Sequence, residues 1–182
     1  FGGAIAIAQG IDQSANGSNA AVSITNASGG VINVSATALT SENLIDGGEG
    51  GGALAKALGA SQNASASSAA SASFSNAGSL TVDAKASAIN AAAVAASGTG
   101  MATAGASASA IGVEQYIFGT AAKAHFANSG TLAVNATANA AGSSAGAHAF
   151  AGGYGIWGDP LNLDVTNSGT LSVSAKATGG NS

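Results

Sequence analysis

The chain contains four copies of a segment in which an asparagine precedes a run of alternating apolar residues. The shared pattern is apolar-x-Asn-x-Gly-x-Leu-x-Val-x-Ala-x-Ala, with two extra residues in the first copy. The asparagines that align the copies, at intervals of 50, 52 and 39 residues, are Asn26, Asn76, Asn128 and Asn167. Alternation with a period of two is typical of β-strands, whose successive side chains point to opposite faces. The repeat therefore predicts one domain of four strand-rich units, at about 1–50, 51–100, 101–142 and 143–182.

The columns of this alignment separate a predicted core from a predicted surface. One column is valine in every copy, at Val34, Val82, Val134 and Val173. The column next to it varies among polar types, with Asp83 in the second copy. Constant apolar columns are expected in the core and variable polar columns in solvent. Asparagine and glycine accept left-handed backbone conformations, so the four aligned asparagines are expected at structural turns between strands.

A second block lies upstream of each asparagine and has alanine in alternate positions. Its first column consists of Ala4, Ala53, Ala106 and Ala147. If these alanines face inward, several apolar residues point outward from the same strands. They form a candidate self-association face, because exposed apolar patches mark contact surfaces, and they are Ile5, Ile7, Leu54 and Phe150. The inverse orientation, with the larger side chains in the core and the alanines exposed, stays open at this point.

The repeat length favours a stack of parallel strands over a β-propeller. Asn-Gly and Asp-Gly hairpin turns do not recur at regular spacing, as four-stranded blades would require. A single coil of about 50 residues would enclose more space than alanine side chains can fill, at ~3.3 Å per residue. We therefore expect an all-β fold: a single-stranded parallel β-helix (β-solenoid) with a narrow, alanine-rich core and about two coils in each 39–52-residue repeat.

The pattern Asn-x-Gly-x-Leu-x-Val-x-Ala, present at 76–84, 128–136 and 167–175, resembles repeats of filamentous-haemagglutinin-like adhesins and autotransporter passenger domains. That resemblance implies a right-handed parallel β-helix. It also implies export, an extracellular or bacterial cell-surface location, and a structural or adhesive role.

Composition argues against several other classes of protein. The chain has eight acidic residues, four lysines and a net charge of −4, and nucleic-acid binding needs clustered basic residues. No apolar run approaches the ~20 residues of a membrane span, so membrane insertion is not expected. The chain has no cysteine, and no cofactor or metal is expected. Asp46 and Glu49 lie in a glycine-rich stretch with few oxygen ligands for calcium, which leaves a weak calcium site open.

No enzyme is expected, because the candidate catalytic side chains fall far apart on two coils per repeat. Asp12 and Glu114 share a column two repeats apart, about 19 Å at ~4.8 Å per coil. A glycosidase needs two carboxylates about 5–10 Å apart. His125 and Asp164 share a column one repeat apart, about 10 Å on the same spacing, which is too far for a direct dyad.

Two aromatic residues in the segment 152–160, Tyr154 and Trp157, are a candidate exposed contact. They are expected to pack under a loop or on a neighbouring chain, or to stack on a surface glycan. The sequence thus predicts a structural or adhesive segment of an exported bacterial surface fibre. It would form a homo-oligomer or polymer through open solenoid ends and an apolar lateral face. A glycan-binding or ice-binding β-solenoid module is the alternative.

Overall fold

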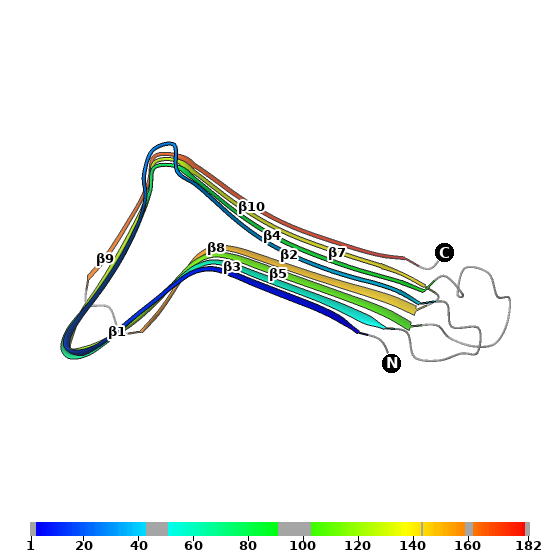
Figure 1. Cartoon of the computed structure of the whole chain (residues 1–182), viewed down its shortest axis with the longest axis horizontal. Coiled ribbons are helices and arrows are strands. Elements are labelled where there is room, and N and C mark those ends of the chain that lie inside the picture. The colour runs from blue at the N-terminus through cyan, green and yellow to red at the C-terminus, as the bar shows by residue number, and fades with distance from the viewer. Residues whose placement is uncertain (1–2, 43–50, 91–102, 143, 159–161, 181–182) are drawn as a thin grey trace, which may run out of the picture.

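The computed structural model describes residues 3–42, 51–90, 103–142, 144–158 and 162–180. Regular structure in these ranges is entirely β-strand, in two sheets whose strand pairs are all parallel. The predicted all-β class with parallel strands is confirmed, and one of the two sheets is strongly curled (Figure 1). Asp46 and Glu49, the candidate calcium ligands, lie outside the described residues.

Each repeat contributes one layer of strands to both sheets. Layer 1 is β1 (Ala4–Asn26) and β2 (Val31–Glu42), and layer 2 is β3 (Gly52–Asn76) and β4 (Ser79–Asn90). Layer 3 is β5 (Thr103–Phe118), β6 (Ala121–Asn128) and β7 (Thr131–Ala141). Layer 4 is β8 (Ser144–Gly158), β9 (Asn162–Asn167) and β10 (Thr170–Gly180). The four-stranded sheet has the order β10-β7-β4-β2, and the curled sheet has the order β8-β5-β3-β6-β9 with β1 on β3.

The pairing register makes successive repeats direct neighbours. Ala4 pairs with Ala53, Ala53 with Ala106, and Ala106 with Ala147. The prediction of about two coils per repeat is therefore wrong, since each repeat supplies a single layer. That prediction assumed an open ring of chain. In the structure the long strands β1 and β3 bend, curl back and then reach the corner with the four-stranded sheet, which removes the empty interior (Figure 1).

The curl divides the interior into two apolar cores. The larger core packs the four-stranded sheet against the curled sheet and contains Phe74, Leu80, Phe126 and Leu132. The smaller core lies within the curl and contains mostly alanines together with Ile117. Most buried apolar residues are alanines, and each buries about one methyl group, worth ~0.8 kcal/mol. The backbone hydrogen bonds between layers must therefore supply much of the structural definition.

Alanine faces inward in the upstream blocks, as the first of the two orientations considered requires. Ala53, Ala55 and Ala57 are 3%, 0% and 3% exposed, whereas Ile5 and Ile7 are 70% and 72% exposed. The inverse orientation is wrong.

A glycine in every layer lets the curled sheet bend close to the four-stranded sheet. The aligned residues are Gly10, Gly59, Gly112 and Gly153. Inward-facing positions change phase here, because Ala57 before Gly59 and Ala60 after it are both buried. A Cβ on Gly59 would overlap the Gly112 carbonyl oxygen and lie 2.7 Å from Cγ2 of Val82. Only glycine leaves room for the valine of the opposing sheet at this bend.

We expect Gly59→Ala to destabilise the protein by about 1–3 kcal/mol, the usual cost of overpacking a closely packed interior. Gly105→Ala is the matched control, because a Cβ at Gly105 would meet nothing within 4 Å. The measurement is the urea midpoint followed by circular dichroism. Equal midpoints for the two variants would contradict the assigned role of the glycine column.

Candidate self-association surfaces

The aligned asparagines form a hydrogen-bonded ladder at the corner between the two sheets. The Nδ2 of Asn26 donates to Oδ1 of Asn76 at 2.8 Å, and that of Asn76 donates to Asn128 at 2.7 Å. The Nδ2 of Asn128 donates to Asn167 at 2.8 Å. Each Nδ2 also donates to the first carbonyl of the four-stranded sheet in the following layer, at Ser79, Thr131 and Thr170. The predicted turns are present, and their side chains bind layer to layer.

In layers 2, 3 and 4 the glycine two residues after the asparagine has a different role from the one predicted. Among the described residues, only Gly29 (φ 79°) and Gly158 (φ 130°) have positive φ, so Gly78, Gly130 and Gly169 do not provide left-handed corners. A Cβ on Gly130 would instead overlap the carbonyl oxygen of Gly78. Close approach of successive corners, rather than backbone handedness, requires glycine there.

A second polar ladder crosses the curl. Gln62 and Gln115 are completely buried. Nε2 of Gln115 donates to Oε1 of Gln62 at 2.8 Å and to the His125 carbonyl at 3.1 Å. Nε2 of Gln62 donates to the Ser73 carbonyl at 2.8 Å. These glutamines connect the outgoing and returning arms of the curled sheet between the two cores.

The outward face of the first arm carries the four predicted contact residues. Ile5, Ile7 and Phe150 are 70%, 72% and 51% exposed, and Leu54 is partly exposed. Ile5 and Leu54 are register neighbours in layers 1 and 2, whereas Phe150 lies in layer 4 beyond Ser109 of layer 3. The face is therefore apolar at both edges and interrupted by Lys56, Ser107 and Ser109.

Two further apolar residues connect these edges diagonally. Leu58 pairs with Ile111, which pairs with Gly152, and the Phe150 ring lies 3.5 Å from where a Cβ on Gly152 would be. A shallow groove of about 210 Å³ is lined by Ile7, Leu58 and Ile111 among others. Ile7 and Phe150 share one column, and Leu58 and Ile111 lie two residues further along the strands. These four residues form an apolar stripe that passes around Lys56 and Ser109 across all four layers, and it remains a candidate contact surface.

The two aromatic residues predicted to be exposed lie in different environments. Tyr154 faces the larger core, stacks on Phe126 with centroids 4.6 Å apart, and donates from its hydroxyl to Oε1 of Gln115 at 2.7 Å. Burial raises the pKa of Tyr154 to about 12. Trp157 is 46% exposed and stacks on Tyr116 at 5.0 Å. Tyr154 thus packs against the core, and of these two residues only Trp157 presents an aromatic surface.

His125 and Asp164 are direct partners, contrary to the predicted separation. Nδ1 of His125 lies 3.0 Å from Oδ2 of Asp164, because single-layer repeats place β6 beside β9.

The same change places Asp12 and Glu114 two strands apart, with Ser61 between them, or about 10 Å at strand spacing. Glu114 is only 9% exposed, and its Oε2 accepts a hydrogen bond from the Tyr116 hydroxyl at 3.2 Å. Burial and Glu114 together raise the pKa of Tyr116.

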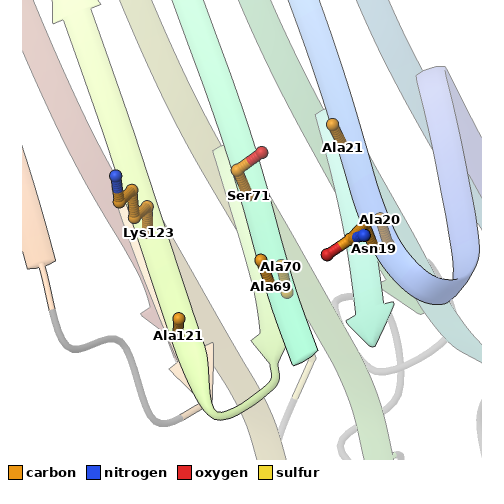
Figure 2. Close-up of a pocket in the computed structure, with 8 residues that line it drawn as sticks. All are labelled: Asn19, Ala20, Ala21, Ala69, Ala70, Ser71, Ala121 and Lys123. Atoms are coloured by element: carbon orange, nitrogen blue, oxygen red, sulfur yellow. The ribbon is translucent and has the colours of Figure 1, made fainter. Parts of the chain in front are cut away.

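A shallow pocket of about 490 Å³ lies on the outer side of the returning arm, across β1, β3 and β6 (Figure 2). Its lining is mostly alanine, with the Lys123 ammonium and the Asn19 amide as its main polar groups (Figure 2). The small side chains lie in register on neighbouring strands. The pocket is a trough between outward-facing alanines and offers no convergent set of polar groups.

The two ends of the stack differ in exposure. Val34 and Ile24 of layer 1 are 6% and 5% exposed, although no described layer precedes them. In the same columns of layer 4, Val173 and Val165 are 44% and 50% exposed. Layer 4 therefore exposes large core side chains, whereas in layer 1 Ile24 and Val34 are buried and Ile11 and Ile32 are partly buried.

Both polar ladders were missed by sequence reasoning, although their signal was present. The asparagines were interpreted as turn chemistry alone, and the aligned Gln13, Gln62 and Gln115 were not considered. A polar residue held constant in copies whose outward positions vary is the signal for a buried ladder. Constant glycine before each glutamine is the corresponding signal for the bend.

We expect Asn76→Ala to destabilise the protein by about 2–4 kcal/mol, because it removes the acceptor of one N–H of the buried Asn26 and the donor to Oδ1 of the buried Asn128, at about 1–3 kcal/mol each. Asn139→Ala, at an exposed position of β7, is expected to change stability by less than about 0.5 kcal/mol. Urea midpoints measure both. A midpoint for Asn76→Ala as high as that of the control would show that the ladder contributes nothing.

We expect the folded protein to lose stability at high pH because of the Tyr154 hydroxyl. The unfolded tyrosine ionises near its ordinary pKa of about 10, whereas the folded group stays neutral until about 12. Its contribution is complete below pH 10 and falls as the pH rises from 10 to 12. Tyr154→Phe should therefore lose less stability than the wild type between pH 9 and 11.5. Identical losses in urea midpoint would contradict this assignment.

Within the described ranges no helix is long and apolar enough to cross a membrane. Those same ranges contain no group of three or more histidine, aspartate or glutamate side chains placed to hold a metal ion. Comparison with known protein families, curated proteins and solved structures found no match to this chain.

Proposed function

We propose that this chain is a structural segment of an exported bacterial surface fibre, in which the layers form a β-solenoid. The observation that carries the proposal is the direct, in-register stacking of four repeats. Each layer repeats the columns of its neighbour, so the arrangement has no internal feature that stops it at four layers. An extended stack of this kind supplies length and stiffness, which is the task of a fibre or stalk.

Export and surface location rest on the resemblance of the asparagine motifs to filamentous-haemagglutinin-like repeats. A cysteine-free chain with low charge fits that setting. An adhesive role rests on the same resemblance, and the apolar stripe supports it, because exposed apolar patches of this kind mark contact surfaces.

The ice-binding alternative lacks a regular threonine array. Thr37 and Thr137 share a column of the four-stranded sheet, but Lys85 separates them and Lys176 follows. The glycan alternative is supported only by Trp157. One face of its ring stacks on Tyr116, so a single aromatic face is available to a sugar. We therefore favour the fibre function over both.

Electron microscopy of the purified chain tests the proposal. We expect fibres with a ~4.7–4.8 Å axial repeat whose number increases with protein concentration. Isolated particles of one chain at every concentration would overturn self-association by this segment.

The lateral stripe is tested by placing like charges on it. Ile5→Asp with Phe150→Asp, which lie in different columns, should separate bundled fibres into single ones while the β-rich circular dichroism stays unchanged, because both side chains are more than half exposed. The control is Ser41→Asp with Ser172→Asp, which adds the same charge to exposed positions of the four-stranded sheet that pair with the uncharged Ile89 and Ala133. Bundling that survives only in the control would support the stripe as the contact surface, and bundling that survives in both would exclude it.

A further inference from the structure

We infer that the C-terminal layer of one copy binds the N-terminal layer of a second copy, so that chains join head to tail in one continuous register. This inference rests on the proposed fibre function and specifies the joint between its subunits. Its partner is a second copy of this chain, bound through layer 4 of one molecule and layer 1 of the next.

The first argument is that the two ends are unlike. In the interior each layer is covered by the layer that follows it, as shown by the low exposure of Ile24 and Val34 in layer 1. The last described layer lacks such a cover, and its core columns are open at Leu163, Val165, Leu171 and Val173, which are 44–51% exposed. Unlike surfaces favour a heterologous contact, and a heterologous contact that does not close produces a filament.

The second argument is that layer 1 matches layer 4 column by column. Following the register through the four layers, Val165 is aligned with Ile24, Leu171 with Ile32, and Val173 with Val34. The glycine column continues in the same way, from Gly153 to Gly10. A second copy placed one strand spacing beyond layer 4 would thus cover each open apolar column with an apolar residue.

Charges do not oppose this joint. On the described part of layer 4, the outward Asp164 would face Ser23 of the next copy, and Lys176 would face Thr37, by the same register. No like charges are brought together in these columns. The glutamine column is a mismatch, because Ile156 occupies it in layer 4. The lengths also differ, because three residues separate Gly158 from Asn162 whereas five separate the aligned Ala15 and Ala21.

The asparagine ladder gives the joint a direction. In every described step the Nδ2 of one layer donates to the Asn Oδ1 of the next layer and to the first carbonyl of the four-stranded sheet there. Asn167 is exposed, and the same step would direct its Nδ2 to the corner of the next copy, at Asn26 and Val31. The layer 1 corner has two extra residues, and its turn extends beyond the other corners within the plane of the layer (Figure 1).

Disulfide trapping tests the register, because the chain contains no cysteine of its own. Asn33 and Ser172 are exposed and share a column. Within one chain they are three strand spacings apart, about 14 Å, which is too far for a disulfide. In the proposed joint they are neighbours. An oxidised mixture of N33C and S172C chains should therefore give a covalent dimer, whereas a mixture of N33C and T178C, about 20 Å out of register, should not.

A second variant tests the ladder without disturbing the single chain. Asn167→Asp keeps an acceptor for Nδ2 of Asn128 but has no donor for the next copy at neutral pH. We expect it to raise the protein concentration needed for assembly about tenfold, the effect of one lost buried hydrogen bond. Asn162→Asp adds the same charge at an exposed position of the same strand and should leave that concentration unchanged. Sedimentation velocity measures both.

The outcomes separate the joint from the fibre function. If the wild type assembles but S172C and N33C crosslink no better than the out-of-register pair, the head-to-tail joint is wrong and the fibre function stands. If Asn167→Asp and Asn162→Asp assemble equally well, the asparagine step does not extend across the joint. If the wild type remains a single chain at every concentration, both the joint and the fibre function are overturned.

Discussion

Each side chain in this protein has, one strand spacing away, the residue that holds the same position in the next repeat. Neighbouring strands are about 4.8 Å apart. A residue type therefore suits a position only if its side chain can lie next to the same residue type in the layers above and below. Charged residues do not, because like charges repel directly across a sheet. Alanine tolerates this spacing at little steric cost. An amide side chain is stabilised by this stacking, since it carries both a hydrogen-bond donor and an acceptor and can hydrogen-bond to the same amide in the next layer.

That constraint accounts for the features that make the composition unusual. The low charge follows from the stacking of outward columns, where Asp83 lies beside the amide of Asn135 at 2.9 Å rather than beside another carboxylate. The inward alanines follow from the narrow space between the arms of the curl. Glycine is fixed where backbones meet, at Gly59 in the bend and at Gly130 on the corner. Phenylalanine appears in the core where space remains, and Phe74 and Phe126 stack on one another at 5.7 Å.

The sequence was sufficient to predict the strands, the inward alanines and the corners, because all three depend on local alternation and on columns shared by the copies. It was insufficient for the path of each layer. The curl depends on contacts between residues distant in the chain, such as Gln62 with the carbonyl of Ser73, and no periodicity encodes them. The prediction assumed that each coil is an open ring and therefore placed two coils in each repeat. On that spacing His125 and Asp164 were expected about 10 Å apart, whereas Nδ1 of His125 lies 3.0 Å from Oδ2 of Asp164. Tyr154 was misplaced for a related reason: its glycine-rich neighbours suggested a loop, but they belong to the bend of layer 4.

The asparagine ladder also explains why such a stack has a direction. Backbone pairing in a parallel sheet repeats in the same way in every layer. It therefore adds no difference in side-chain chemistry between the first layer and the last. The asparagine amides do, because every described Nδ2 donates toward the C-terminal layer. The apolar columns share this polarity, with Val34 covered in layer 1 and Val173 open in layer 4. The asparagine amides and the apolar columns therefore give the described stack one and the same direction.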